Sequence, residues 1–483
     1  MAVLENCEPK KVFHYFEEIS GIPRGSGNTK QISDYLAGFA RERGLRYVQD
    51  ELNNIVIYKS AAPGYEKAPT VILQGHMDMV CEKRPDVEHD FTKDGLKLSV
   101  VDGCVTANGT TLGGDDGIAV AYALAILDST EIPHPPLEVL ITVDEEIGLL
   151  GAVGLDCSVL EGRRLLNLDS EEEGSLWVSC AGGLCGNSHI PVKWTKAEGK
   201  KLSIKICGLA GGHSGSEINK NRANANVLMG RFLYGLKEVC DYAVVMLAGG
   251  SKDNAIPREC DVQILVLPQD AQAVQTYGAE FAQTLEKEYA GSEEGIAVCV
   301  MDLGEEECVA LTPTSQEKIL FFLMNVPYGV AKMSGTIPGL VETSSNLGVL
   351  KLTEEELWGV TSVRSSIGSA RDALSAKVEY LTEFLGGDYE VQGAYPAWEY
   401  RKDSPLRDKM VEVYERMYHK KPNVVAIHAG LECGLFYEKM EGLDCVSLGP
   451  DMKDIHTSEE RLDIASTQRV WEYLLEVLKS LKD

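Results

Sequence analysis

The sequence predicts an α/β fold made of two domains, one of which is discontinuous. Short apolar runs of strand length alternate with helical segments over the first 186 residues, and strands of alternating polarity follow them. Buried apolar runs return near the C-terminus, and a chain of 483 residues is long enough for two sizeable domains. We therefore expect a mixed, mostly parallel, twisted sheet flanked by helices, interrupted by an inserted α/β domain.

Two helices open the first domain, one on each side of a glycine-rich loop. Apolar residues recur at helical spacing between Val12 and Ile19 and between Ile32 and Phe39, and the sequence GIPRGSGN separates the two segments. A helix of small apolar residues that starts at Gly117 is expected to pack against a sheet. The strands of that sheet are expected at 54–58, 70–74, 137–143 and 164–168.

The inserted domain begins at a change of composition near residue 186. A succession of strand and helix occurs twice in it, which indicates two similar halves. The expected strands are 188–194, 200–206 and 357–366, and the expected helices are 224–239 and 373–385.

The first domain resumes after the insertion. Buried runs return at 423–430 and 443–449, and an amphipathic helix at 467–481 ends the chain. We therefore place the discontinuous domain at 1–186 and 397–483 and the inserted domain at 187–396.

The composition is that of a globular protein and excludes several classes of function. Hydrophobic residues make up 44% and charged residues 25%, and 46 Lys and Arg against 74 Asp and Glu leave a net charge of −28. This charge repels nucleic acid and anionic lipid, so neither nucleic acid nor a membrane is expected as a partner. No apolar run approaches the about 18 residues of a membrane span, and charged residues interrupt the N-terminal segment, which predicts a cytoplasmic protein. The 13 Cys lack regular spacing and indicate reduced thiols.

Side chains that can ligate a metal ion follow the ends of the predicted strands. Because sites in open α/β sheets form outside the carboxyl ends of the strands, we expect these groups to converge. The four carboxylates of Asp115, Glu145, Glu146 and Asp169 would repel each other in one crevice without a cation, and two divalent ions would balance them. Imidazole and carboxylate ligands without thiols suit Zn²⁺, with Mn²⁺ and Co²⁺ as alternatives. The residues concerned are His76, Asp78, Asp115, Glu145, Glu146, Asp169 and the distant His456.

Each of these signals also has an ordinary structural explanation. A lone His often completes a hydrogen bond in a core, VDEE is typical of a solvated turn, and Asp115 or Asp116 can cap a helix. Independent structural causes would not place every such group at a strand exit. We therefore favour the metal site.

Seven motifs in order along the chain resemble those of one enzyme family. They are QGHMDMV, TLGGDDG, TVDEEIGLLGA, LLNLDSEEEG, LAGGHSG, IHAGLECGLF and DIHTSEE. The family is that of the aminoacyl-histidine dipeptidases, also called peptidase D or cytosol non-specific dipeptidases, within the wider group of di-zinc aminoacylases, carboxypeptidases and dipeptidases. The resemblance spans nearly the whole chain. It implies that the inserted domain is a lid and dimerisation domain and that the protein is a homodimer.

The resemblance also implies the roles of the metal ligands. His76, Asp115 and Asp169 would bind the first zinc ion, and Asp115 would bridge to a second ion held by Glu146 and His456. The first acid of GGDD matches the bridging position. This match selects Asp115 over the acid that follows it.

Three further residues have catalytic roles by the same resemblance. Glu145 would be the general base for a water that bridges the zinc ions, and Asp78 would orient the His76 ring. His213 of the inserted domain would stabilise the oxyanion, and in relatives this His can reach the site of a partner subunit. A structural role in a surface loop is the alternative for His213.

The expected substrate is a dipeptide with a free N-terminus, Xaa-His among them. The resemblance nominates Asn254, Arg364, Gly430 and Glu432 for substrate binding, and a surface ion pair is the alternative for Arg364. His428 is left open between a structural role and the pocket lining. Asp rather than Glu at position 169 favours a substrate with a free amine. The alternatives are an N-acyl-amino-acid deacylase, a carboxypeptidase or a non-catalytic peptide-binding protein.

Overall fold

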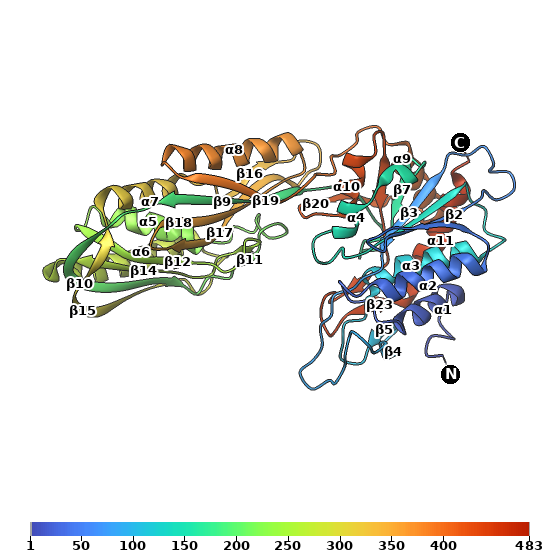
Figure 1. The fold of residues 1–483 in the computed structure, drawn as a ribbon, viewed down its shortest axis with the longest axis horizontal. Helices are drawn as coiled ribbons and strands as arrows, with labels where there is room; N and C mark the ends of the chain where they lie inside the picture. Colours follow the sequence, from blue (N-terminus) through green and yellow to red (C-terminus); the bar gives the residue numbers. More distant parts are fainter. Residues whose placement is uncertain (1, 483) are drawn as a thin grey trace. The chain divides into compact units, whose positions relative to one another are not determined.

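The first structural unit is built on a mixed sheet of eight strands (Figure 1). The structure is a computed structural model that describes residues 2–482. The central strands β6, β3, β7 and β21 run parallel, whereas β1, β2 and β8 pair antiparallel with their neighbours. This mostly parallel sheet confirms the predicted fold class. In order across the sheet the strands are β1 (Arg46–Gln49), β2 (Ile55–Lys59), β6 (Leu137–Thr142), β3 (Val71–His76), β7 (Arg164–Asn167), β21 (Asp444–Ser447), β8 (Ser175–Cys180) and β20 (Asn423–Ile427).

Helices pack on this sheet and form one hydrophobic core with it. The core receives side chains from α1, α2, α3, α9 and α11 and from the central strands. All but the last residue of α3 are buried, as its small apolar sequence predicts. The helices of this unit are α1 (Lys10–Ser20), α2 (Lys30–Glu42), α3 (Gly114–Asp128), α4 (Leu150–Gly154), α9 (Pro405–Tyr418), α10 (Glu432–Lys439) and α11 (Ile464–Ser480), with a short 3₁₀ helix at Cys157–Val159.

The central strands bring their carboxyl ends to one edge of the sheet. Every residue of β3 and β6 is buried, which explains why these strands read as continuous apolar runs. The parallel neighbours β6, β3 and β7 end at Thr142, His76 and Asn167, so the segments that follow them leave the sheet side by side. A small antiparallel sheet carries the loop between β22 and β23. Its strands are β22 (Met452–Lys453), β23 (Arg461–Asp463), β5 (Cys104–Ala107) and β4 (Leu98–Val101).

The second structural unit is a nine-stranded sheet with its own core of helices and strands (Figure 1). Its strands pair antiparallel with one another. Its strands are β15 (Ala297–Leu311), β10 (Trp194–Cys207), β14 (Cys260–Val266), β12 (Tyr242–Gly249), β17 (Val341–Leu352), β18 (Glu356–Ser365), β9 (Gly182–Pro191), β19 (Asp388–Tyr395) and β16 (Gly329–Met333), and β11 (Gly212–His213) pairs with β13 (Ala255–Ile256). Its helices are α5 (Ala225–Leu236), α6 (Ala271–Glu288), α7 (Pro313–Asn325) and α8 (Gly368–Phe384), with a short 3₁₀ helix at Pro268–Asp270.

Some predicted elements differ from the observed ones at their ends. The strand predicted at 188–194 is the end of β9 and the start of β10, because Pro191 has no N–H to continue the ladder. The helix predicted at 373–385 starts five residues earlier, at Gly368, since its first turn is polar and lacks the apolar repeat.

The chain divides into two structural units, and the segments of the first unit lie on both sides of the second in sequence. The first unit comprises the described residues of Met1–Ser179, Tyr400–Ala426 and Leu431–Asp483, and the second comprises Cys180–Glu399 and Ile427–Gly430. The lid and dimerisation role of the inserted unit stays a prediction. Within residues 2–482, no helix combines the length and the apolar character that a membrane crossing requires.

Candidate metal centre

Five side chains from distant parts of the first unit meet at the carboxyl ends of the central strands. His76 ends β3, Asp115 lies in the first turn of α3, and Asp169 follows β7. Glu146 comes from the turn after β6, and His456 comes from the loop between β22 and β23. The parallel order of β6, β3 and β7 explains why three of these five groups converge.

The carboxylate of Asp115 faces both imidazole rings. Its Oδ1 lies 3.1 Å from His76 Nε2, and its Oδ2 lies 3.0 Å from His456 Nε2. Each ring nitrogen also faces a second carboxylate, at 3.6 Å between His76 Nε2 and Asp169 Oδ1 and at 3.1 Å between His456 Nε2 and Glu146 Oε2. The structure therefore brings all five predicted metal ligands together, with Asp115 shared between two groups.

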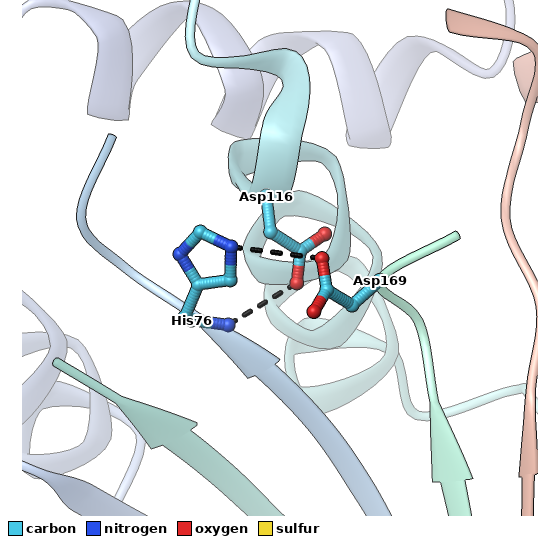
Figure 2. A group of neighbouring side chains, drawn as sticks. All are labelled: His76, Asp116 and Asp169. Carbon is cyan, nitrogen blue, oxygen red and sulfur yellow. Dashed lines mark hydrogen bonds and ion pairs between the residues drawn. The ribbon is translucent and has the colours of Figure 1, made fainter. Parts of the chain in front are cut away.

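The neighbouring Asp116 has a different environment (Figure 2). Its Oδ2 accepts a hydrogen bond of 3.1 Å from the backbone N–H of His76, while its Oδ1 has no hydrogen-bond partner among residues 2–482. Figure 2 shows the His76 ring facing Asp169, with Asp116 beside them. These three residues offer possible ligand atoms within 4.8 Å of one another. Asp116 thus supports the end of β3, whereas Asp115 faces both imidazoles.

Asp78 is buried on the other side of the His76 ring. Its Oδ1 lies 3.3 Å from His76 Nδ1 and accepts the backbone N–H of Glu145 at 3.1 Å. Its Oδ2 accepts the hydroxyl of Ser26, from the glycine-rich loop, at 2.8 Å. This placement is the one expected of a carboxylate that orients a metal-ligating imidazole.

A tight turn presents Glu145 and Glu146 on the same side of the chain. β6 ends at Thr142, Asp144 has a left-handed φ of 53°, and the backbone N–H of Leu149 donates to the Glu145 carbonyl at 2.8 Å. In a continuing strand these two neighbours would point to opposite faces. In the turn, both offer a carboxylate oxygen within 4.8 Å of a ring nitrogen of His76.

Burial and mutual repulsion raise the pKa of several carboxylates in the cluster. Burial, together with the charges of Asp115 and Glu146, raises the pKa of Asp169 to about 6. Burial and the charges of Asp169 and Glu146 also raise the pKa of Glu145 well above its ordinary value. The cluster therefore disfavours its own negative charge unless cations balance it.

The imidazoles of the cluster respond in the opposite sense. Hydrogen bonds to Asp115 and Glu146 raise the pKa of His456 to about 11. Burial favours a raised pKa for Asp115, but hydrogen bonds from His456 and His76 bring it below the ordinary value. The raised pKa of His456 favours a proton between its ring and the facing carboxylates. A metal ion would fit the same positions, because imidazole nitrogens and carboxylate oxygens are metal ligands. Glu146 Oε1 has no hydrogen-bond partner within the described chain and is available as a ligand atom.

Four of the other predicted site residues lie in the second unit. A backbone hydrogen bond of 2.9 Å joins the residue after His213 to the carbonyl of Asn254. Arg364, at the end of β18, donates from Nη1 to the Tyr395 hydroxyl at 2.8 Å. Tyr395 packs so closely on Gly430 that a Cβ there would lie 2.7 Å from its ring. The buried Nε of Arg364 has no hydrogen-bond partner among residues 2–482, so its guanidinium retains a donor.

Hydrogen bonds determine the tautomer of His213. The backbone N–H groups of Gly215 and Ser216 both donate to His213 Nδ1 at 3.2 Å, which leaves the proton of a neutral ring on Nε2. Burial and the positive charge of Arg364 lower the pKa of His213. His213 is therefore a neutral hydrogen-bond donor through Nε2.

His428, left open by the sequence, is buried in the same unit. Its Nε2 lies 2.7 Å from the hydroxyl of Ser344. Burial lowers its pKa to about 4, with the charges of Arg364 and His213 acting in the same direction. It is therefore a neutral ring that packs beside Ser344.

Glu432 lies beneath the strand ends and has 0% exposure. Its Oε2 accepts hydrogen bonds from Gln74 at 2.6 Å and from Thr142 at 2.7 Å. Burial raises its pKa to about 8. A direct contact with substrate stays a prediction for this residue.

Four supporting residues were missed by the sequence reasoning. Arg24, Ser26 and Glu460 contact the segments that carry the metal-ligand candidates, and Tyr395 contacts Arg364. The first three lie in the motifs GIPRGSGN and DIHTSEE. The motifs contained the signal, but residue type and spacing do not show which of their members contact the segments that carry the ligand candidates.

Several known proteins that are similar to this chain are peptidases. Residues 72–480 match the model of peptidase family M20/M25/M40. The chain is 37% identical over 483 residues to the cytosol non-specific dipeptidase of Escherichia coli (strain K12), with 100% of this chain and 99% of that protein covered. Among solved structures, the aminoacylhistidine dipeptidase of Vibrio alginolyticus has a TM-score of 0.93 and 36% identity, with 99% of this chain and 98% of that chain covered. The aminopeptidase PepT of Bacillus cereus shares the fold, with a TM-score of 0.58 and 15% identity over 99% of this chain and 100% of its own.

Proposed function

Because this chain belongs to peptidase family M20/M25/M40, we propose that it is a metal-dependent dipeptidase that hydrolyses dipeptides with a free N-terminus, Xaa-His among them. The observation that carries this proposal is the Asp115 carboxylate, which faces the imidazoles of His76 and His456 at 3.1 and 3.0 Å. The names of relatives that are 37% and 36% identical over nearly the whole chain support the substrate class.

The proposed cofactors are two Zn²⁺ ions, with Mn²⁺ or Co²⁺ as alternatives. His76, Asp115 and Asp169 would hold one ion, and Asp115, Glu146 and His456 would hold the other. Bound there, the two ions would acidify a water molecule and polarise the scissile carbonyl. Asp78 would hold the His76 ring in the tautomer whose Nε2 is free to ligate, because its own Oδ1 lies 3.3 Å from Nδ1.

Glu145 would move the protons of the reaction. Its carboxylate would take a proton from the attacking water while the new C–O bond forms at the scissile carbonyl. His213 would donate from Nε2 to the developing oxyanion. Glu145 would then return the proton to the departing amine as the C–N bond breaks. The raised pKa of Glu145 supports this role, since a general base must hold a proton between the two steps.

Recognition of the substrate termini would depend on charged side chains and on backbone groups. Arg364 would pair with the carboxylate of the dipeptide, and Asn254 and Gly430 would contact its backbone. Asp169 and the buried Glu432 would favour a free amine. We further propose that the protein is a homodimer in the cytoplasm, and the measured mass in solution tests the first of these points.

A free dipeptide and its N-acetylated form distinguish the proposed activity from its alternatives. The metal-loaded protein is expected to hydrolyse the free dipeptide with a kcat/KM about 10- to 100-fold higher, because a lost charge-assisted hydrogen bond costs about 1.5–3 kcal/mol. The measurement is digestion of a dipeptide library and of its acetylated counterpart, each with a chelated control. Preference for acetylated substrates would instead identify a deacylase or carboxypeptidase. Binding of two metal equivalents with no hydrolysis would identify a peptide-binding protein.

Replacement of Arg364 by Met is expected to raise KM for dipeptides by about 10- to 100-fold. The guanidinium would lose its charge-assisted pairing with the substrate carboxylate, at a cost of about 1.5–3 kcal/mol. Michaelis profiles of the variant and of Arg231→Met give the comparison, since Arg231 forms an ion pair with Glu288 on the exposed surface of the same unit. An unchanged KM in Arg364→Met would remove Arg364 from the substrate site.

A further inference from the structure

The carboxylate of Glu460 is buried against the turn that leads into α3. Its Oε2 accepts the backbone N–H groups of Leu112 at 2.7 Å and Gly113 at 3.0 Å. Its Oε1 accepts those of Gly114 at 2.8 Å and Asp115 at 3.4 Å. Glu460 is 3% exposed, so four successive peptide groups of the 112–115 turn depend on one side chain that solvent does not replace.

Arg24 binds the same turn with a positive charge, whereas Glu460 binds it with a negative one. Its guanidinium donates to the carbonyls of Gly113, Met77 and Asp78, and the side chain is 2% exposed. Burial lowers the pKa of Arg24, and the neighbouring carboxylate of Glu460 opposes that change. Gly113 therefore donates its backbone N–H to the carboxylate of Glu460, and its carbonyl accepts a hydrogen bond from the guanidinium of Arg24.

Glycine is required where the turn approaches these groups. Gly113 has a left-handed φ of 63°, and a Cβ on it would lie 2.5 Å from Arg24 Nη2. A Cβ on Gly114 would lie 3.3 Å from Glu460 Oε1. The two glycines before Asp115 thus allow the backbone to come close to both charged side chains.

Glu460 also lies on the loop that carries His456. The loop is compact, since the Glu460 N–H donates to the Thr457 carbonyl at 3.3 Å and His456 has a left-handed φ of 62°. One carboxylate therefore ties the backbone of Asp115 to the loop of His456. These are the two residues whose side chains meet at 3.0 Å.

We propose that Glu460 is a positioning residue that sets the distance between Asp115 and His456 and thereby creates the second metal position. This inference rests on the proposed function, because it concerns the affinity of the site shared by Asp115, Glu146 and His456. Glu460 touches neither substrate nor metal in this role. It acts through the four N–H groups of the turn.

Metal binding to Glu460→Gln tests the proposal without an activity assay. A glutamine keeps the shape but has one acceptor oxygen, and its NH₂ group would face N–H donors of the turn. Titration of the metal-free protein with Zn²⁺ against a competing chelator is expected to show the site that includes His456 weakened about 10- to 100-fold, as for other groups that support metal ligands, and the site that includes His76 weakened less. Amide hydrogen exchange at 112–115 is expected to accelerate in the same variant.

The control is Glu459→Gln, which removes an equal charge from the adjacent residue. Glu459 has a side-chain exposure of 59% and lies 3.7 Å from Arg84, so both metal affinities should stay at the wild-type values. Glu460→Asp retains the charge with a shorter reach and should weaken the second site less than Gln does.

Each outcome of these titrations decides between the two proposals. A wild-type protein that binds fewer than two ions would contradict the proposed function itself. Two ions bound with wild-type affinities by Glu460→Gln would overturn only the positioning role. Failure of both Glu460 variants to fold would also overturn it, because Glu460 would then stabilise the whole unit instead of one metal position.

Discussion

Replacement of Glu145 by Gln is expected to lower kcat for dipeptide hydrolysis by about 10²–10⁴-fold, the usual contribution of a general base. Glutamine has nearly the same volume but cannot accept the proton of the attacking water. The backbone N–H of Glu145 that donates to Asp78 stays in place, because the substitution leaves the main chain unchanged. Two metal equivalents should therefore remain bound in the variant.

Steady-state kinetics and metal analysis of the same samples test this expectation. Glu172→Gln is a suitable control, since it removes an exposed carboxylate that follows Asp169 closely in sequence. Turnover near the wild-type level in Glu145→Gln would exclude Glu145 as the base. Loss of metal in that variant would assign Glu145 to the ligands instead.

Removal of the metal ions is expected to lower activity by roughly a thousandfold, since several kcal/mol of transition-state stabilisation are lost and each 1.4 kcal/mol is a factor of ten. The metal-free cluster would retain its carboxylates, with the pKa of Asp169 raised by burial and neighbouring charge to about 6. Protons on the imidazoles would then offset part of this charge instead of metal ions, since hydrogen bonds to Asp115 and Glu146 raise the pKa of His456 to about 11. Zn²⁺ should restore turnover in proportion to occupancy of two sites.

The measurement combines dialysis against a chelator, elemental analysis and reconstitution with Zn²⁺, Mn²⁺ or Co²⁺. The melting temperature should fall on metal removal, because ions that bind only the folded state stabilise it by about 2.7 kcal/mol at 100 times their Kd. Full activity in protein shown to be free of metal would contradict the proposal. The relative rates with the three metals would identify the one that the site favours.

The sequence was sufficient to predict the fold class and the family resemblance, and both are confirmed. Continuous apolar runs predicted β3 and β6 because both faces of these strands are covered. Element ends were less accurate. At 188–194 the apolar pattern crosses the break between β9 and β10, which arises from one missing N–H at Pro191.

The metal-ligand candidates could be identified in advance because strand exits in α/β sheets converge at one edge. Glu460 and Arg24 could not, because their partners are backbone groups far away in sequence. Glu460 contacts peptide N–H groups at 112–115, and Arg24 contacts the carbonyls of Met77 and Gly113. Backbone N–H groups are the same in nearly every residue, so no pattern of side chains marks these contacts.

The sequence by itself determined which residue types reach the carboxyl edge of the sheet. The order of apolar and polar residues predicts where each buried strand ends and which polar residues follow it. Only the tertiary structure decided how adjacent acids divide their environments. Asp115 faces two imidazoles while Asp116 accepts the N–H of His76, and Glu432 is enclosed beneath the strands. The physical reason is that the direction of a side chain depends on the local backbone and on packing by distant segments, neither of which is encoded at a single position.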